Sequence, residues 1–469
     1  MTKDRTATDR EARNLVSEKR QKTARTSNEK GSGEAMDRPE EGLETRATTN
    51  ELEDQDNLME EILDSENLKR AYKSVVKNSG APGIDGVTTK DLKSYLAANW
   101  HQARTELRSG TYKPKPIKRV EIPKPDGGVR KLGIPTVLDR FIQQAIMQVL
   151  QSKWDKTFSP HSYGFRPGRS AHQAVEKAKE YIRAGNRIVV DIDLEKFFDR
   201  VNHDILMSRV AKRIHDKRVL KVLRAFLNAG VLENGLVQPT EEGVPQGGPL
   251  SPILSNLLLD ELDQELEKRR LHFVRYADDC NIYVASERAG ERVKESITKF
   301  LARRLRLKVN EEKSAVGKPS KRKFLGFSFV LGAEPKIRLS ESSKLRFQRR
   351  IRELTRPTKG RSLEQVIQSL RRYLIGWRGY YRICQTPSIF TKLDKWIRRR
   401  LRCYQWRLWK RGTTRYSELT KRGITPLTAA GVAGSPRGPW RISGSPPLQH
   451  ALPNAYLAAL GLPSLVASN

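Results

Sequence analysis

Two adjacent carboxylates, Asp278 and Asp279, stand between two strand-like runs, Leu271 to Tyr276 and Asn281 to Ala285. The alternation of apolar and polar residues on both sides predicts a β-hairpin with the two acids at its tip. Asp is common in turns, so an isolated Asp-Asp pair is usually only a turn. Two like charges side by side also repel each other unless a cation pairs them. The hairpin therefore needs a second acidic element before it indicates a functional site.

A second acidic element lies upstream, in the strand-like segment Asn186 to Asp193. The two-residue period of a strand places Asp191 and Asp193 on one face and three β-branched residues on the other. Carboxylates on such a face cost free energy unless something pairs them. If this strand lies beside the hairpin, three carboxylates converge, and such oxygen ligands suit one or two Mg²⁺ ions. Two ions of this kind support in-line phosphoryl transfer.

The balance of charge limits the partners. The 469 residues include 89 Lys and Arg against 54 Asp and Glu, a formal charge of +35. Such an excess favours nucleic acid as the counter-charge. No apolar run approaches the roughly 18 residues of a membrane span, and the start has no signal-peptide core, so we expect a cytoplasmic protein without a membrane partner. The three cysteines are widely spaced, which argues against a disulfide framework and a Cys-paired zinc site.

The composition divides the chain into four parts. Residues 1–55 are polar and rich in both charges, which predicts a disordered extension. Residues 56–335 alternate helix, strand and hairpin patterns, as in an α+β domain. Residues 336–412 are expected to be helical, and from Glu341 to Arg411 they hold 21 Lys and Arg against 4 Asp and Glu, with ten aromatic residues. Residues 413–469 predict a tail or a small DNA-binding appendage.

Several local elements have predictable ends. Apolar residues at helical spacing, turn residues and a capping Ser predict four helices and one hairpin. The helices are expected over Glu60 to Lys77, Arg140 to Trp154, Ala171 to Ile182 with Ser170 as N-cap, and Ile253 to Leu266, and the hairpin pairs Arg119 to Ile122 with Val129 to Ile134.

Three motifs in succession carry a resemblance to a known family. They are Asp191-Ile-Asp-Leu-Glu-Lys-Phe-Phe-Asp199, Gly243-Val-Pro-Gln-Gly-Gly-Pro249 and Tyr276-Ala-Asp-Asp279. In this order they resemble palm motifs of the reverse transcriptases encoded by group II introns. Gly80 to Gly86 is similar to the extra N-terminal motif of that family, Phe324 to Phe327 to its primer grip, and Ser369 to Tyr381 to its maturase or thumb segment. The resemblance covers about residues 60–412. It implies an α+β right-hand polymerase fold, with fingers and palm on an antiparallel sheet, followed by an α-helical thumb or maturase domain.

The resemblance also implies the metal site. It assigns two Mg²⁺ ions, which Mn²⁺ can replace, to three catalytic aspartates and one backbone carbonyl, namely Asp193, Asp278, Asp279 and Leu194. In the family, the first aspartate precedes by five residues the aromatic that closes on the sugar. Asp193 and Phe198 fit that spacing, so Asp191 is assigned as a supporting acid.

Further roles follow from matching positions. Four residues are expected at the incoming nucleotide: Lys124, Arg130, Phe198 and Gln246. Phe198 would exclude a 2′-hydroxyl by bulk, with core packing as the alternative. Lys313 is a candidate general acid toward pyrophosphate, although an exposed, solvated lysine is the more ordinary interpretation. The primer grip is expected at Phe324, Leu325 and Gly326. RNA contacts are expected from Arg371, Arg372, Trp377, Arg378 and Tyr381, although for any one aromatic of this segment packing is the favoured interpretation.

The implied function is an RNA-directed DNA polymerase that copies intron RNA and acts as a maturase in splicing and mobility. Its partners would be intron RNA, a DNA target or primer and dNTPs, with a homodimer as a candidate assembly, in the bacterial cytoplasm or on nucleoid DNA. No Cys pair or His-Asn cluster follows residue 412, so the endonuclease domain of some relatives is expected to be absent, and a replication fork or nicked end would supply the primer.

Three alternatives remain open. One is a splicing-only, RNA-binding maturase with a decayed palm, which the intact acids disfavour. Another is a retron, diversity-generating or CRISPR-associated reverse transcriptase, which the thumb segment disfavours. The third is an RNA-templated RNA polymerase, which Phe198 disfavours.

Overall fold

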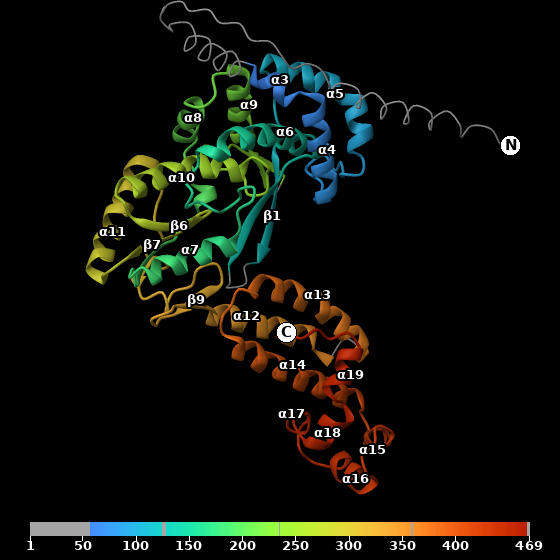
Figure 1. Cartoon of the computed structure of the whole chain (residues 1–469). Helices are drawn as coiled ribbons and strands as arrows, with labels where there is room; N and C mark the ends of the chain where they lie inside the picture. The colour runs from blue at the N-terminus through green and yellow to red at the C-terminus, as the bar shows by residue number, and fades with distance from the viewer. Residues whose placement is uncertain (1–56, 124–127, 234, 358–359, 467–469) are drawn as a thin grey trace, which may run out of the picture. The chain divides into compact units, whose positions relative to one another are not determined.

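A computed structural model describes residues 57–123, 128–233, 235–357 and 360–466 (Figure 1). The extension predicted to be disordered, residues 1–55, lies outside these ranges. The described residues all belong to one compact unit. None of their helices is both long enough and apolar enough to cross a membrane.

Helices open the described chain. They are α3 (Leu58–Ile62), α4 (Ser65–Asn78) and α5 (Leu92–Ser109). Asp64 accepts hydrogen bonds from the backbone of Glu66 and Asn67 and so caps α4. The single helix predicted over Glu60 to Lys77 is therefore two helices, because this N-cap interrupts the apolar pattern.

A four-stranded sheet follows, with the strand order β2-β1-β4-β5. Its strands are β1 (Ile117–Pro123), β2 (Val129–Ile134), β4 (Val231–Glu233) and β5 (Leu236–Gln238). β1 and β2 form an antiparallel hairpin, which confirms the predicted hairpin, while β4 joins β1 in parallel. The turn of the β1–β2 hairpin includes residues 124–127, which the structure does not describe.

The central sheet has the order β6-β7-β3-β8, and all of its pairs are antiparallel. Its strands are β3 (Ile188–Ile192), β6 (His272–Tyr276), β7 (Asp279–Val284) and β8 (Ala315–Gly317). The acidic strand therefore lies directly beside the acidic hairpin, as predicted. One face of the sheet contributes to a large apolar core, and the other contributes to a second core that extends into the helices after residue 340.

Helices cover both faces of this sheet (Figure 1). α7 (Ala171–Arg183) packs on one face, and α10 (Ser251–Lys268) and α11 (Glu287–Phe300) pack on the other. The remaining helices of this part of the chain are α6 (Val137–Trp154), α8 (His203–Ala211) and α9 (Lys217–Leu227), and α6 and α8 pack against α10. Ser170 caps α7 in a reciprocal capping box with Gln173, which confirms the predicted N-terminus. The predicted helices at α6 and α10 are also confirmed, each with a slightly earlier start.

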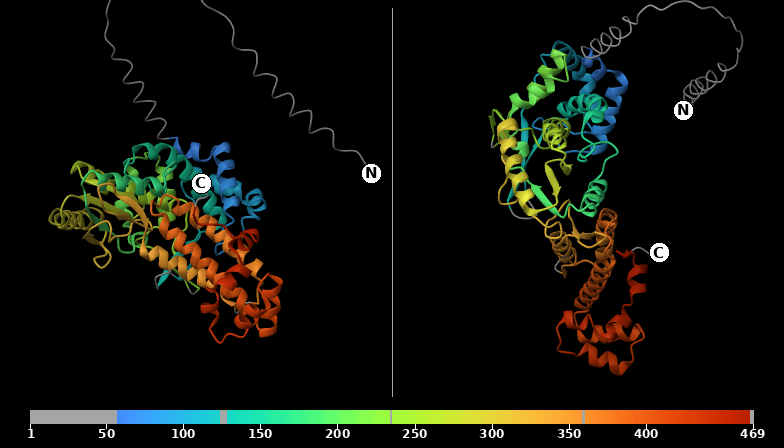
Figure 2. Two further views of the ribbon diagram at one scale, coloured as in Figure 1. Left: turned by 60° about the horizontal axis from the view of Figure 1, so that its bottom comes forward. Right: turned by 60° about the vertical axis from the view of Figure 1, so that its left-hand side comes forward.

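Three long helices form the thumb segment, drawn in orange in Figures 1 and 2. A hairpin of β9 (Phe327–Val330) and β10 (Lys336–Leu339) leads into α12 (Glu341–Leu354), α13 (Leu363–Tyr381) and α14 (Pro387–Leu408). The boundary expected at residue 335 falls inside this hairpin. The predicted α+β class, an antiparallel sheet followed by a helical segment, is confirmed.

The last segment folds as a small group of short helices. Its helices are α15 (Gly412–Lys421), α16 (Pro426–Ala433), α17 (Pro439–Ile442), α18 (Pro446–Ala451) and α19 (Asn454–Ala459). Trp406, Trp409, Leu419 and Leu448 belong to its own apolar core. Pro426, Pro439 and Pro446 occupy the first position of three of these helices, where the missing N–H of proline costs nothing. Its DNA binding stays a prediction.

Candidate functional site

The acidic hairpin turns through two residues, Ala277 and Asp278. Tyr276 pairs with Asp279 across the turn, so Asp279 opens strand β7, and the two acids do not both occupy the tip. Ala277 adopts the left-handed conformation, with φ of 58°. β3 pairs with β7 so that Ile192 lies opposite Cys280. Continued by one residue, this register sets Asp193 against Asp279, so the three predicted carboxylates meet at one end of the sheet.

The carboxylates perturb one another. Partial desolvation by the surrounding protein raises the pKa of Asp279 to about 7, and the charges of Asp278, Asp191 and Asp193 add to the rise. Its side chain nevertheless keeps access to solvent. Desolvation and the charge of Asp193 also raise the pKa of Asp278, against the opposing effect of Arg130. A cluster of mutually repelling acids open to solvent is typical of a functional site.

The two acids of strand β3 have different partners. Asp191 accepts hydrogen bonds from the guanidinium of Arg322, at 2.7 and 3.2 Å. The nearest cation of Asp193 is the ammonium of Lys313, at 4.0 Å from its carboxylate. Two N–H groups of one guanidinium already compensate Asp191 at its Oδ2, whereas the ammonium beside Asp193 stands at the outer limit of ion-pair distance. This arrangement supports the choice of Asp193 over Asp191.

The donor set fits hard divalent cations, because it consists of carboxylate oxygens and the backbone carbonyl of Leu194. Across residues 57–466, outside the short undescribed gaps, no three His, Cys, Asp or Glu side chains lie close enough together to hold an ion as they stand. Binding would therefore require side-chain rotation at Asp193, Asp278 and Asp279. The backbone of Leu194 is held by a β-bridge to Val309.

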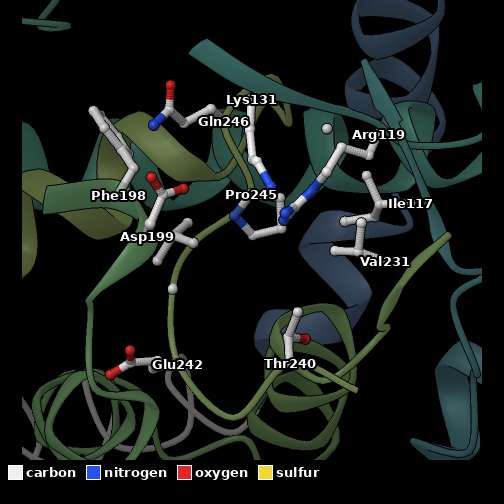
Figure 3. A pocket seen from close by; sticks show the side chains of 13 residues that line it. Ile117, Arg119, Lys131, Phe198, Asp199, Val231, Thr240, Glu242, Pro245 and Gln246 are labelled. Carbon is white, nitrogen blue, oxygen red and sulfur yellow. The ribbon is translucent and has the colours of Figure 1, made fainter. Parts of the chain in front are cut away.

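The structure brings two of the expected nucleotide residues together. Phe198 and Gln246 line one pocket, into which Arg119 and Lys131 also reach (Figure 3). Arg130, exposed on β2, lies near enough to Asp278 for its charge to lower the pKa of that acid. Lys124 lies outside the described residues.

Backbone hydrogen bonds hold this pocket. The amide of Gly133 donates to the carbonyl of Gln246 at 2.8 Å, and that of Val244 donates to the carbonyl of Phe198 at 2.6 Å. They tie the Gly243 to Pro249 loop to the β1–β2 hairpin and to the segment after β3.

Sequence reasoning missed Arg119 and Lys131. Both pair with Glu233, at 3.4 and 3.2 Å. The sequence could have indicated them, because each strand of the β1–β2 hairpin carries one of these basic residues and the same hairpin carries Arg130, predicted to bind the nucleotide.

The predicted primer grip is a tight turn held against the thumb. Leu325 and Gly326 both have positive φ, and Phe324 and Phe327 exchange two backbone hydrogen bonds of 2.9 Å. The hydroxyl of Tyr380 donates to the carbonyl of Leu325 at 2.8 Å. A side chain at Gly326 would meet the Tyr381 hydroxyl, so only glycine fits there.

The five predicted RNA contacts lie on α13 but face different ways. Tyr381 is buried, and Trp377 is half-buried with its ring centroid 4.2 Å from that of Phe347. Tyr381 belongs to the thumb core and Trp377 packs against it, so their contacts with RNA stay predictions. Arg378 donates to the carbonyl of Ser464 at 3.2 Å. Two of the five are exposed, Arg371 and Arg372.

Two family profiles match the chain in succession. Residues 122–329 match "Reverse transcriptase (RNA-dependent DNA polymerase)". Residues 344–423 match "Group II intron, maturase-specific domain". The first match holds the central sheet and its acidic hairpin, and the second holds the three thumb helices and α15.

Three curated relatives agree with these matches. Protein YkfC of Escherichia coli is 35% identical over 299 residues, 55% of this chain and 78% of YkfC. The group II intron-encoded protein LtrA of Lactococcus lactis is 29% identical over 349 residues, 59% of this chain and 57% of LtrA. The "Putative COX1/OXI3 intron 1 protein" of Saccharomyces cerevisiae is 26% identical over 70% of this chain and 48% of its own length. The alignments thus span only about half of the last two relatives. Together with the profiles they confirm the predicted resemblance: the chain belongs to the group II intron-encoded reverse transcriptases, RNA-dependent DNA polymerases that carry a maturase-specific domain.

Proposed function

We propose that this protein copies intron RNA into DNA and binds the same RNA as a maturase. The observation that carries the polymerase half is the convergence of Asp193, Asp278 and Asp279 at one end of the central sheet, beside a basic nucleotide pocket. A protein that only binds RNA has no use for an acid cluster with so strained an electrostatic environment. The intact cluster therefore disfavours a decayed palm.

The chain's own residues divide the work of nucleotide addition. Asp193, Asp278, Asp279 and the Leu194 carbonyl would hold Mg²⁺, or Mn²⁺ in its place, which would supply charge for the primer hydroxyl and the leaving pyrophosphate. Arg130, which is near enough to Asp278 for its charge to oppose the rise in the pKa of that acid, would bind the triphosphate, and Lys124 is expected to do the same. Lys313, whose ammonium lies 4.0 Å from Asp193, is the candidate to deliver a proton to pyrophosphate. The Phe324 to Gly326 turn would hold the primer end against the thumb.

Primer extension tests this function directly. The full-length protein with Mg²⁺ and dNTPs is expected to extend a DNA primer on an RNA template, and a chelator should stop the reaction. Binding of intron RNA without any extension, at any divalent metal concentration, would instead support the splicing-only alternative.

The aromatic ring of Phe198 should set the preference for dNTPs. Its half-buried ring lines the pocket, with its centroid 5.1 Å from that of Phe197, so it is held rather than free. We expect Phe198→Ala to raise the relative efficiency of rNTP incorporation by about tenfold, because the space for a 2′-hydroxyl opens. The measurement is kcat/KM for matched rNTP and dNTP pairs. An unchanged ratio would show that Phe198 only packs.

The maturase half is supported by the maturase-specific match and by the basic thumb. Arg371 and Arg372 are exposed on α13. We expect Arg371→Ala with Arg372→Ala to weaken intron RNA binding about fivefold and to lower the salt slope by about one for each phosphate that the variant no longer binds. Filter binding at several salt concentrations measures both. The control is Arg183→Ala, an exposed arginine of α7 paired with Glu334.

A homodimer, nucleoid association and the primer source stay predictions.

A further inference from the structure

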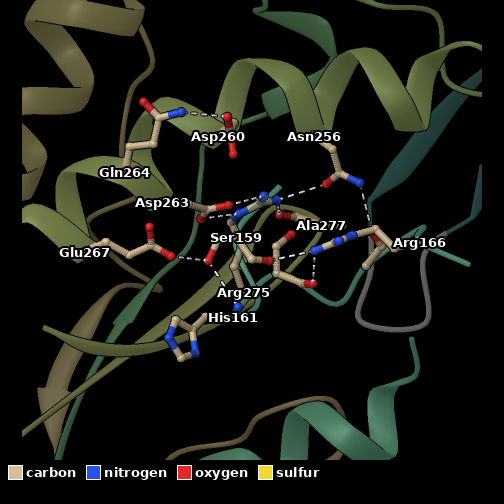
Figure 4. A network of polar contacts seen from close by, with 12 residues as sticks. Ser159, His161, Arg166, Asn256, Asp260, Asp263, Gln264, Glu267, Arg275 and Ala277 are labelled. Carbon is tan, nitrogen blue, oxygen red and sulfur yellow. Dashed lines mark hydrogen bonds and ion pairs between the residues drawn. The ribbon is translucent and has the colours of Figure 1, made fainter. Parts of the chain in front are cut away.

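A buried ion pair lies directly behind the acidic turn. The side chains of Arg275 and Asp263 are both 0% exposed. Arg275 Nε donates to Asp263 Oδ1 at 2.7 Å, and Nη2 donates to Oδ2 at 2.5 Å. Figure 4 shows Arg275 reaching from strand β6 to Asp263 on helix α10. Both residues lie outside the motifs that carry the family resemblance.

The third nitrogen of the guanidinium reaches the turn itself. Arg275 Nη1 donates to the carbonyl of Ala277 at 2.9 Å and to Asn256 Oδ1 at 3.1 Å. Ala277 is the left-handed residue that immediately precedes Asp278. Its carbonyl belongs to the peptide plane that leads into Asp278, so the hydrogen bond fixes the direction in which the chain presents the two acids.

A second segment holds the turn from its other side. The amide of Arg275 donates to the carbonyl of His161 at 3.0 Å, and the amide of Tyr163 donates to the carbonyl of Arg275 at 2.9 Å. Asn256 Nδ2 donates to the carbonyl of Gly164 at 2.9 Å. A side chain on Gly164 would overlap the backbone nitrogen of Ala277, so these two backbones are in direct contact. The turn is therefore clamped between α10 and the 161–164 segment.

We infer that Arg275 is a positioning residue of the polymerase site, which holds the Ala277 carbonyl and thereby orients Asp278 and Asp279 toward their ligand. The inference rests on the proposed function. Stability alone explains the pair poorly, because apolar residues of similar volume often replace a buried ion pair without loss of stability. The carboxylate of Asp263 neutralises the guanidinium of Arg275. The guanidinium can therefore lie beneath the acid cluster without pairing with Asp278 or Asp279 and blocking their ligand.

The test removes the donor while keeping the packing. In the full-length protein, Arg275→Met with Asp263→Leu replaces the ion pair by apolar side chains. We expect a thermal midpoint close to that of the wild type, a kcat for dNTP addition at least about tenfold lower, and an unchanged KM for primer–template. The affinity for Mn²⁺, measured by electron paramagnetic resonance, should fall severalfold. Arg275→Lys should lower kcat in the same direction, because one ammonium cannot serve Asp263, Asn256 and Ala277 together.

The matched control is a neighbouring ion pair whose acid, Asp260, lies on the same helix α10 as Asp263. Arg213 donates to Asp260 at 2.8 Å and to Thr157 at 2.7 Å. Arg213→Met with Asp260→Leu should keep kcat within about twofold. Wild-type kcat and Mn²⁺ affinity in a folded Arg275 variant would overturn the inference, and if the double variant does not fold, Arg275→Lys decides by the same readouts. A wild type that binds Mn²⁺ but never extends a primer would overturn the proposed function instead, while Mn²⁺ binding by the variants still tests Arg275.

Discussion

Asp278→Ala is expected to lower the rate of dNTP incorporation by at least about 10³-fold, with intron RNA binding and splicing nearly intact. The substitution removes one of the three converging carboxylates, and neither of the others can take its place in the turn. The exposed arginines predicted to contact RNA lie on α13, in the thumb. The two activities should therefore separate in one variant. Primer extension, filter binding and a splicing assay on the same preparation measure the separation.

The control for this variant is an acid outside the cluster. Asp204 on α8 is 81% exposed and pairs with Arg224 at 2.7 Å, so Asp204→Ala should leave both activities unchanged. Thermal unfolding would identify a variant that has simply lost its fold. Polymerisation retained in a folded Asp278→Ala protein would contradict the site assignment at the centre of the proposed function.

The juxtaposition of the acidic strand and the acidic hairpin was predictable because both signals are local. The two-residue period of the Asn186 to Asp193 segment and the Asp278-Asp279 pair of the hairpin are each visible within about eight residues. Because the two elements are antiparallel neighbours in the sheet, their acids then lie at the same end. The partner of Asp191 was not predictable. Arg322 lies 131 residues further along the chain, and nothing near either residue indicates that they meet.

The thumb and the last segment show a different limit. Composition predicted a basic helical surface with aromatic residues, but composition does not say which side of α13 faces inward. The ring of Trp377 contacts those of Phe347 and Tyr381 in tilted geometry, so this side of the helix packs against the core. In residues 413–469, several Pro and Gly residues mark the ends of short helices, which composition alone does not show. One signal for the Arg275–Asp263 pair was present in the sequence. Arg275 is a charged residue in a largely apolar strand, and such a residue needs a buried partner.

Asp279→Asn is expected to stabilise the protein in chelator at pH 8, although it should inactivate the polymerase. The pKa of Asp279 is raised from 3.8 to about 7, so its ionised form is disfavoured in the folded state. A group of this kind contributes stability that is fully present below its unfolded pKa and is lost as the pH rises through its folded pKa. For Asp279 the loss therefore develops between about pH 4 and pH 7. An asparagine amide has the same shape and carries no charge, so the variant does not lose this stability as the pH rises.

The expected gain is about 2 kcal/mol, since a shift of this size corresponds to about 4 kcal/mol and solvent access to the side chain screens part of it. Urea unfolding at several pH values should show the gain growing from about pH 4 to pH 7 and then levelling off, while Asp204→Asn, at the exposed acid of α8, shows no such growth.

Saturating Mg²⁺ should make the wild type more stable than Asp279→Asn, because a ligand that binds only the folded state stabilises most the protein that binds it best. An amide that destabilises the metal-free protein at pH 8 would mean that the carboxylates do not repel one another, and the electrostatic argument for a cation site would fail. The reversal, by contrast, would tie the instability of this cluster directly to the ion it is proposed to bind.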